Sequence, residues 1–340
     1  MKLCIFIFFF TLACLAESCK TRDFNTQLGP IRNQSNVGWC FANTGADLLT
    51  FAHKQRLSSD PENQVSAIFT ALNYYNAQLN GGVAYSEVFD HGGFILDAIN
   101  IIQSKGFVCP QSLDLLLMNT GYKTQLKEKF VQFKFFYDVY QDYKRTGAEE
   151  KKADFLKSIE KLEKQGTFLS AYNKDKIKSV LEEPTLELAT MKMVDVVCEN
   201  KKISITDIPR FDRISRQDSN LYYSSLNRGW VDWSFTFLTI NKILDDFQPV
   251  GLVYQVDKVL VEPKMAFGGH ASVISGRKII NGECHYQIRN SWGPDCTRNA
   301  IIDNIFTENH RIYSYFCDKG TFWVPEKDMN QLIDEIVFQH

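Results

Sequence analysis

The sequence lacks the residue spacings through which proteins usually bind zinc. Its 340 residues include nine cysteines and six histidines, but no pair has the C-x-x-C or H-x-x-x-H spacing. Zinc sites usually take their ligands from such pairs, so a zinc site is disfavoured.

The sequence also lacks an excess of charge of either sign. Lysine and arginine total 38 and aspartate and glutamate total 40, which gives a net charge of −2 at pH 7. Proteins that bind nucleic acid usually carry a basic excess, so nucleic-acid binding is disfavoured. The hydrophobic content of 44% is enough for a large core.

Long apolar runs are missing as well, apart from one at the N-terminus. Residues 4–16 are almost wholly apolar, follow the basic Lys2 and end in small residues, and the run is too short to span a bilayer. This pattern predicts a signal peptide over residues 1–16, with cleavage after Ala16. A lipid anchor through Cys14 is the alternative. In both cases we expect an exported protein, which is secreted, periplasmic or on the cell surface.

The cysteine count agrees with export. Cys4 and Cys14 leave with the leader and Cys40 is set aside, so six cysteines remain, enough for three disulfides in an oxidising compartment. These six are Cys19, Cys109, Cys198, Cys284, Cys296 and Cys317. We predict only the pair Cys296–Cys317, because these two cysteines lie close together in the sequence.

Cys40 stands at the start of a predicted helix. Ala42, Ala46 and Leu49 recur at helical spacing after it, so its thiol lies in or near the first turn. At that end of a helix the dipole and the backbone N–H groups stabilise an anion such as a thiolate. Cys40 is therefore a candidate nucleophile. A buried structural cysteine is the alternative, because cysteine is among the most buried residue types.

Two predicted strands later in the chain each carry a polar residue at one end. His270 opens the apolar run that contains Val273 and Ile274, and Asn290 closes the run 286–289. If the two strands are adjacent, an imidazole and an amide lie side by side. A lone histidine is more often a core or surface group than a base, but the order Cys, His, Asn is a rarer combination.

Gln34, Cys40, His270 and Asn290, in this order, resemble the papain-like cysteine peptidases, the family of papain and the cathepsins. That family has its cysteine near the mature N-terminus, with His and Asn about 130–150 residues downstream. Here the two residues follow Cys40 by 230 and 250 residues. The difference indicates an insertion of about a hundred residues. The local motif also departs, with Gly-Trp-Cys-Phe where the family usually has Gly-Ser-Cys-Trp.

The resemblance implies an α+β, two-lobed papain-like fold with a large helical insertion. It predicts a helical lobe over residues 17–110, the insertion over 111–228 and a β-rich, barrel-like lobe over 229–340. Secreted members of the family usually carry a long inhibitory propeptide before the glutamine. Here only residues 17–33 would precede Gln34 in the mature chain.

The resemblance also implies a role for each matched residue. Cys40, as a thiolate, attacks a carbonyl carbon, and His270, protonated beside it, later protonates the leaving amine. Asn290 holds the imidazole in the productive tautomer. Gln34 and the backbone N–H of Cys40 form the oxyanion hole.

Three further residues are expected on the substrate side of the site. Gly92 and Gly93 precede a predicted helix that ends at Gly106, and this order resembles the family's substrate-binding segment. There a glycine backbone pairs with an extended peptide, which needs close approach. The alternative is that these glycines only form a turn. Trp292 is expected to shield the hydrogen bond between His270 and Asn290 from water, or else to belong to the core.

The insertion has no counterpart in the resemblance. A stripe of large side chains at helical spacing predicts a packing surface rather than a binding site. The stripe consists of Leu126, Phe130, Phe133, Tyr137 and Tyr140. Residues 203–227 are polar and are expected to be loop. One hypothesis is that the insertion lies over or beside the cleft and does part of the work of the missing propeptide. The alternative is that it packs on the back or side of the fold.

The predicted function is that of a cysteine-type peptidase, an exported monomer that hydrolyses peptides or proteins through a Cys40 thioester. The reaction is expected to need no metal and no organic cofactor. One alternative is an exported Cys-His amidase that acts on peptidoglycan peptides. Another is a catalytically silent binding protein on a peptidase scaffold, which the four intact positions disfavour. The only N-glycosylation sequon begins at Asn33, so a glycan there would lie on the proposed oxyanion donor, Gln34. A secretory pathway that attaches glycans is therefore disfavoured, and a bacterial host is favoured.

Overall fold

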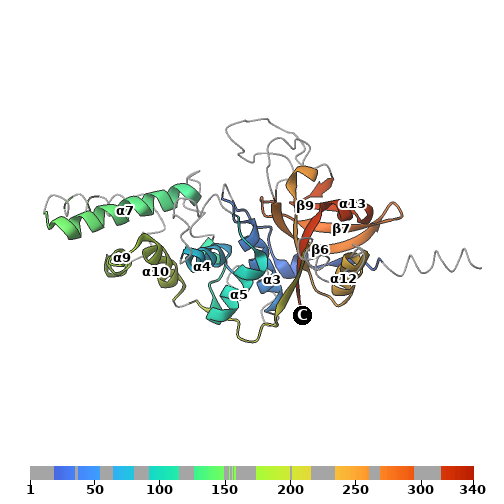
Figure 1. Ribbon diagram of the computed structural model, residues 1–340, viewed down its shortest axis with the longest axis horizontal. Helices are drawn as coiled ribbons and strands as arrows, with labels where there is room; N and C mark the ends of the chain where they lie inside the picture. The colour runs from blue at the N-terminus through green and yellow to red at the C-terminus, as the bar shows by residue number, and fades with distance from the viewer. Residues whose placement is uncertain are drawn as a thin grey trace, which may run out of the picture. The chain divides into compact units, whose positions relative to one another are not determined.

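The structure is a computed structural model, and it describes most of the chain (Figure 1). The described residues are 19–34, 37–53, 64–79, 92–114, 126–148, 153, 155, 157, 174–199, 201–215, 234–259, 269–294 and 315–340. The expected signal peptide 1–16, with Cys14, lies outside these residues. So does Cys296, the expected partner of Cys317.

The chain divides into two compact units, each built from separate parts of the sequence. The first, which we call the sheet unit, consists of Met1–Asn33, Asp47–Ser59 and Asp207–His340. The second, the helical unit, consists of Gln34–Ala46 and Asp60–Thr206. Helix α3 (Cys40–Ala52) contributes residues to both units.

An antiparallel sheet, with eight strands among the described residues, forms the core of the sheet unit (Figure 1). Its order is β4-β10-β5-β6-β7-β9-β8, and β1 also pairs with β6. The strands are β1 (Arg22–Asp23), β4 (Phe211–Ser215), β5 (Val250–Gln255), β6 (Gly269–Ile280), β7 (Glu283–Arg289), β8 (Phe316–Asp318), β9 (Thr321–Pro325) and β10 (Ile333–Gln339). Branched and aromatic side chains are buried along β5, β6 and β7, as their preference for a pleated surface favours.

Two tight turns fix the register of the strands around the site. Asn281 and Gly282 join β6 to β7 with φ values of 53° and 82°, which is the geometry that a two-residue hairpin turn requires. Lys319 and Gly320 join β8 to β9 with φ values of 48° and 78°. Each turn brings a strand back beside its predecessor.

The expected barrel-like lobe is wrong, because the sheet is open. Among the described strands, the hydrogen-bonded path ends at β4 on one side and at β8 on the other. β8 has only three residues, and β4 exposes the charged side chains of Asp212 and Arg213. Short and charged edge strands discourage further pairing, so the sheet does not close on itself. The fold class is therefore mixed helix and sheet, with an open sheet.

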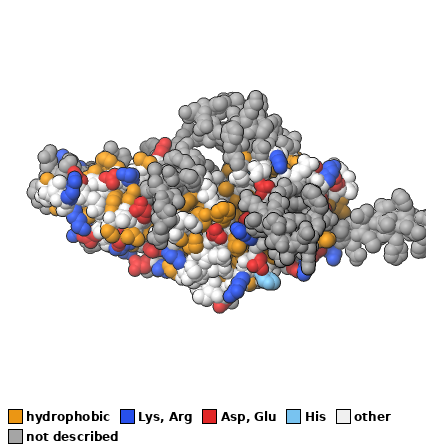
Figure 2. Space-filling view, in the orientation of Figure 1, with side chains coloured by type: hydrophobic (Ala, Val, Ile, Leu, Met, Phe, Trp, Pro, Cys, Tyr) orange, Lys and Arg blue, Asp and Glu red, His pale blue; other side chains and the backbone are white. Residues whose placement is uncertain are grey.

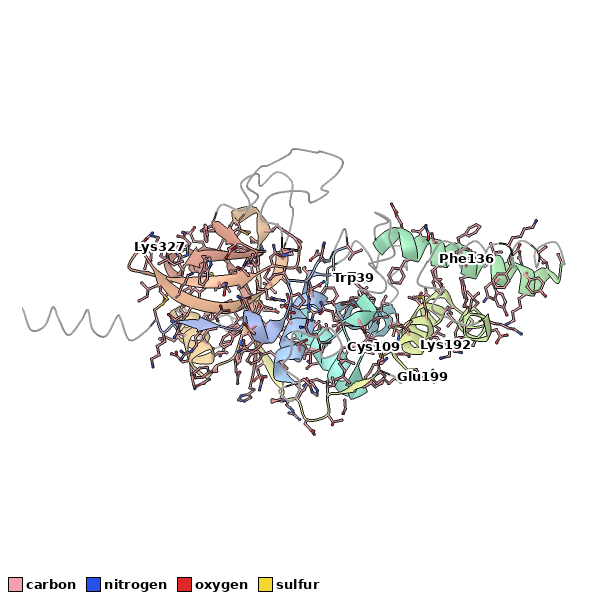
Figure 3. All side chains as sticks on the ribbon, turned by 180° about the vertical axis from the view of Figure 1, so that it is seen from behind. Trp39, Cys109, Phe136, Lys192, Glu199 and Lys327 are labelled. Atoms are coloured by element: carbon pink, nitrogen blue, oxygen red, sulfur yellow. A yellow bond between two sulfur atoms is a disulfide. The ribbon has the colours of Figure 1, made fainter. Side chains whose placement is uncertain are left out.

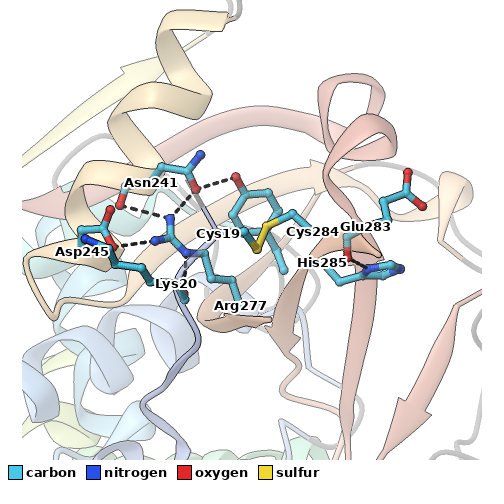
Figure 4. Close-up of a disulfide and its surroundings, with 9 residues drawn as sticks. Cys19, Lys20, Asn241, Asp245, Arg277, Glu283, Cys284 and His285 are labelled. Atoms are coloured by element: carbon cyan, nitrogen blue, oxygen red, sulfur yellow. Dashed lines mark hydrogen bonds and ion pairs between the residues drawn. A yellow bond between two sulfur atoms is a disulfide. The ribbon is translucent and has the colours of Figure 1, made fainter. Parts of the chain in front are cut away.

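A disulfide and a buried arginine hold the start of the described chain against this sheet (Figure 4). Cys19 is bonded to Cys284 on β7. Arg277 on β6 donates hydrogen bonds to the carbonyl of Lys20 at 2.9 Å and to the carboxylate of Asp245 at 2.5 Å. Asp245 is the last residue of α12 (Ser234–Asp245), so this arginine also fixes that helix to the sheet. Helices α2 (Asn25–Leu28) and α13 (Glu326–Leu332) and the short turn η4 (Val256–Lys258) complete the unit.

The described part of the helical unit contains the first residues of α3 and several further helices. They are α4 (Ala67–Leu79), α5 (Ile95–Lys105), α7 (Leu126–Thr146), α9 (Lys174–Leu181) and α10 (Leu186–Cys198). α5 ends where expected, at Gly106, which has a left-handed φ of 71° and donates its N–H to the carbonyl of Gln103. Strand β2 (Phe107–Val108) then pairs with β3 (Ile203–Ser204). The stretch 203–227, expected to be loop, therefore begins in β3 and also contains β4.

The large side chains of the insertion form a packing surface, as predicted. Phe130, Phe133, Tyr137 and Tyr140 on α7 are all buried. The hydroxyl of Tyr137 donates to the carbonyl of Glu183 at 3.0 Å, which ties α7 to the turn between α9 and α10. Figure 2 shows basic and acidic side chains interspersed over the visible outer surface of these helices, as on a solvated face.

A second disulfide closes the base of the insertion. Cys109 follows β2 and is bonded to Cys198, the last residue of α10. The bond joins positions 89 residues apart, at a place where β2 and β3 already pair. Cys317 in the sheet unit is also disulfide-bonded.

Candidate functional site

The polar pair in the sheet unit is formed by His270 and Asn290. His270 is the second residue of β6, opposite Tyr254 of β5, and Asn290 directly follows the last residue of β7. Because β6 and β7 are neighbours, the two side chains meet, with 2.8 Å between the imidazole Nε2 and the amide Oδ1. Both are buried, with exposed fractions of 5% and 2%. The side-by-side placement that the sequence indicates is thus present.

The hydrogen bonds around Asn290 define the state of the imidazole. Its Oδ1 also accepts the backbone N–H of Ser291 at 2.6 Å, so this atom is the amide oxygen rather than the nitrogen. An oxygen that only accepts requires a proton on Nε2 of His270. In the neutral ring the other nitrogen, Nδ1, then carries the lone pair and can act as a base.

Burial determines the charge of His270. It lowers the pKa of the imidazole from 6.5 to about 4, and the hydrogen bond to Asn290 opposes this shift. The neutral ring therefore predominates at pH 7 in these surroundings. The resemblance implies an imidazolium, whereas burial favours a neutral base.

Two aromatic rings enclose the imidazole within the sheet unit. The indole of Trp292 lies 4.6 Å from it between ring centroids, and the ring of Tyr254 lies 5.6 Å away, edge to face. Trp292 is half-buried, and Tyr254 is buried with its hydroxyl 3.2 Å from that of Ser272. Sequence reasoning finds Trp292 but misses Tyr254, because only the register of β5 against β6 places it beside His270.

Three buried charged side chains form a cluster that includes Arg289, the residue directly before Asn290. Asp47 accepts a hydrogen bond from Arg289 at 2.8 Å and one from Arg32 at 2.5 Å. Arg289 also donates to the carbonyls of Gly29, at 2.9 Å, and Pro30. This cluster joins α3, the end of β7 and the segment before Gln34. Sequence reasoning misses it, since Asp47 and Arg289 are 242 residues apart and carry no local signal.

In the helical unit, Cys40 is the first residue of α3, as the pattern predicts. The carbonyl of the preceding residue, Trp39, accepts the backbone N–H groups of Ala42 and Asn43, both at 3.1 Å, and the Asn43 side-chain amide at 2.9 Å. The helix therefore begins at a well-defined point. Cys40 is half-buried and is the one cysteine among the described residues that is not in a disulfide.

The side chain of Gln34 is buried a few residues before Cys40. Its Nε2 donates to the carbonyl of Val37 at 2.9 Å, within the segment that leads to the helix. An amide nitrogen has two hydrogens, and this bond uses one of them. The bond holds the amide in a fixed orientation relative to its own loop.

The two glycines before α5 differ in their surroundings. A Cβ atom on Gly93 would lie 2.7 Å from the ring of Tyr74 and 2.8 Å from that of Phe41, so packing alone requires a glycine there. A Cβ atom on Gly92 would meet nothing within 4 Å, and the Gly92 carbonyl accepts the hydroxyl of Tyr75 at 3.5 Å. Gly93 thus has a structural reason to be glycine that does not involve substrate, and Gly92 has none.

The expected site residues fall into two groups. His270, Asn290 and Trp292 lie together in the sheet unit, and Gln34, Cys40, Gly92 and Gly93 belong to the helical unit. Among the described residues, no cluster of three or more His, Cys, Asp or Glu side chains is arranged to hold a metal ion. None of the described helices is both long and apolar enough to cross a membrane.

No known family model matches the chain, and no curated protein sequence matches it. Among solved structures it is similar to SERA5E from Plasmodium falciparum, at 12% identity over 93% of this chain and 91% of that one, with a TM-score of 0.45. PepW from Lactobacillus rhamnosis HN001 is 11% identical over 94% and 81%, with a TM-score of 0.42. The digestive procathepsin L2 proteinase from Tenebrio molitor larval midgut is 13% identical over 94% and 67%, also with a TM-score of 0.42. Similarity at this level carries no argument about the reaction, which rests on the residues of this chain.

Proposed function

We propose that the protein is a papain-like cysteine peptidase, with Cys40 as nucleophile and His270 as acid and base. The observation that carries the proposal is the buried hydrogen bond between His270 and Asn290. It leaves Nδ1 of a neutral imidazole as the basic atom, which is the state a general base needs. A thiol at a helix start, outside any disulfide, supplies the nucleophile.

In the proposed reaction, Nδ1 of His270 takes the proton of the Cys40 thiol as the sulfur attacks the carbonyl carbon of a peptide bond. The negative charge on the carbonyl oxygen is bound by the backbone N–H of Cys40 and by the Gln34 amide. The C–N bond then breaks, His270 returns the proton to the leaving amine, and a thioester remains on Cys40. Water, deprotonated by His270, attacks the thioester and releases the acid and the thiol. Asn290 keeps Nε2 protonated throughout.

The proposed substrate is a peptide or protein outside the cytoplasm, and the reaction needs no cofactor. Trp292 shields the bond between His270 and Asn290, and Gly92 offers backbone groups to an extended peptide. The two described disulfides support an exported protein, because disulfides persist in oxidising compartments. An exported amidase that acts on peptidoglycan peptides would use the same chemistry, so the substrate distinguishes the two.

The first test is covalent titration of the purified protein with a thiol-directed epoxide, read by mass spectrometry. We expect one adduct per chain, on Cys40, and none in Cys40→Ser. A digest of a peptide library, read in the same way, then shows which bonds are cut. Cleavage confined to peptidoglycan peptides would favour the amidase, and no adduct on Cys40 would favour the silent binding protein.

Two variants test the assigned roles. Cys40→Ala is expected to abolish turnover, because the proposed thioester forms on the Cys40 sulfur. Gln34→Ala is expected to slow turnover by on the order of 100-fold or more while the protein stays folded, because one donor of the oxyanion hole is lost. Initial rates on one cleaved peptide, with circular dichroism as a folding control, measure both. Full activity of Cys40→Ala would end the proposal.

A further inference from the structure

The residue before Cys40 is enclosed by aromatic side chains of the helical unit. The indole of Trp39 is 1% exposed and lies 6.3 Å between centroids from Tyr75 of α4. Its backbone carbonyl accepts the hydrogen bonds that begin α3. The position of Trp39 therefore sets the position of the Cys40 backbone and thiol. Any group that holds the indole also holds the nucleophile.

The insertion supplies one of these groups. Phe130 on α7 is 2% exposed, and its ring lies 6.1 Å from that of Trp39, edge to face. The residues of α7 also belong to the same compact unit as the segment Gln34–Ala46. The insertion is thus packed against the residue that precedes the nucleophile.

The same aromatic group reaches the glycine pair. Tyr75 contacts Trp39, and its hydroxyl donates to the carbonyl of Gly92 at 3.5 Å. Burial raises the pKa of Tyr75 above its usual range, and the nearby charges of Tyr74 and Cys40 act in the same direction. Cys40 directly follows Trp39, so its thiol is next to these residues in the chain. Phe130, Trp39 and Tyr75 form one packed group beside the thiol, which we call the aromatic wedge.

We propose that Phe130 of the insertion is a positioning residue for Cys40, acting through Trp39, and that the reaction therefore depends on the insertion. This inference rests on the proposed function for its effect on turnover. Loss of the Phe130 ring leaves a space into which the Trp39 indole can move, and the first turn of α3 moves with it. A small misplacement of a nucleophile costs far more in rate than in substrate binding.

The test compares Phe130→Ala with a matched control, Phe136→Ala. Phe136 lies on the same helix and is also buried, and its aromatic contact is with Phe135, at 5.7 Å, rather than with Trp39. Phe136 follows Phe130 along α7, and Figure 3 shows it well away from Trp39. Both variants lose the same ring from the same helix, so both lose some thermal stability. Only Phe130→Ala removes a member of the aromatic wedge.

Two readouts separate positioning from stability. The first is the rate of Cys40 alkylation by iodoacetamide, measured from pH 4 to 9, which does not require turnover. The second is the pair of constants kcat and KM, measured on a cleaved peptide. In Phe130→Ala we expect a changed pH profile of alkylation and a fall in kcat of roughly 10- to 100-fold with little change in KM. Phe136→Ala should keep the wild-type profile and kcat, and Phe130→Leu, which refills part of the space, should recover part of the loss.

Equal alkylation profiles and equal kcat in Phe130→Ala and Phe136→Ala would overturn the inference. If Phe130→Ala does not fold, Phe130→Leu takes its place, and a wild-type profile in that variant is the contrary result. A protein that cleaves no peptide would contradict the proposed peptidase, but the alkylation profile would still decide whether Phe130 positions Cys40. The two failures are therefore distinguishable.

Discussion

His270 is buried, and burial affects the charge of its imidazole more than its hydrogen bond to Asn290 does. Burial disfavours the imidazolium, and the hydrogen bond to Asn290 only partly offsets that cost. The ring is thus neutral near pH 7 and becomes charged only in acid. The same shift must appear in the stability of the protein, because protonation and unfolding are linked.

We predict that stability falls as the pH is lowered from 6.5 to about 4. In this range an unfolded histidine binds a proton and the folded His270 does not, so acid favours the unfolded state. The loss attributable to this residue is up to about 3 kcal/mol, and it levels off below the folded pKa. Urea unfolding at several pH values measures it.

His270→Gln is the control for this prediction, because an amide can occupy part of the ring's place without titrating. Its stability should depend less on pH across the same window. Parallel curves for wild type and His270→Gln would contradict the lowered pKa. The acid limb of peptidase activity in the wild type should likewise lie well below pH 6.5.

At the scale of secondary-structure elements, the segment before α5 packs so closely against two aromatic rings that it needs a glycine at position 93. Gly93→Ala would place a methyl group against the rings of Phe41 and Tyr74, with no room for it. We predict a destabilisation of about 1–3 kcal/mol, as for other overpacked cores. Thermal or urea unfolding measures it, and a wild-type midpoint would show that the rings move aside at no cost.

Gly92→Ala is the matched control, since the added methyl group meets no atom within 4 Å. It should leave stability within about 0.5 kcal/mol of the wild type. If Gly92 binds an extended peptide, the same variant should raise KM. The pair of variants therefore separates the structural role of one glycine from the proposed binding role of the other.

The charge cluster of Arg32, Asp47 and Arg289 joins the segment before Gln34, helix α3 and the end of β7. Asp47→Ala leaves two buried guanidinium groups without their shared carboxylate, and we predict a loss of about 3–5 kcal/mol in unfolding free energy. Asp138→Ala, which breaks an exposed pair with Lys134 on α7, should cost less than about 1 kcal/mol. Urea unfolding compares the two. Equal losses would mean that the buried cluster contributes no more than a surface pair.

At the scale of the whole molecule, the described disulfides connect parts of the chain that lie far apart in sequence. One joins the start of the described chain to β7, and the other closes the base of the insertion. Neither joins neighbours in sequence, so each strongly reduces the conformational entropy of the unfolded chain. The thiol of Cys40 remains outside this network.

Removal of the Cys109–Cys198 bond, by replacing both cysteines with serine, should lower stability by about 4–5 kcal/mol, because a long loop is released. The variant is best made in a Cys40→Ser background, which prevents thiol exchange. Non-reducing alkylation and mass mapping of the wild type should label Cys40 and leave Cys317 unlabelled. Labelling of Cys109 and Cys198 in the native protein would contradict the pairing.

Local features of this protein are determined by the sequence alone. The spacing of Ala42, Ala46 and Leu49 predicts a helix from Cys40, and the structure begins α3 there. Gly106 is predicted and found as the end of α5. The runs that begin at His270 and end at Asn290 predict strands, and the insertion's stripe predicts a packed helix face. These features depend on residues within a few turns of one another, so periodicity and end signals suffice.

Only the tertiary structure decided the features that join distant residues. The open sheet, the pairing of Cys109 with Cys198, the contact of Asp47 with Arg289 and the packing of Phe130 on Trp39 each depend on the path of the whole chain. The charge of His270 belongs with them, because its pKa follows from burial between β5 and β7 rather than from its neighbours in sequence. A residue's type fixes which interactions it can make, but desolvation and long-range contacts arise only when the chain has folded.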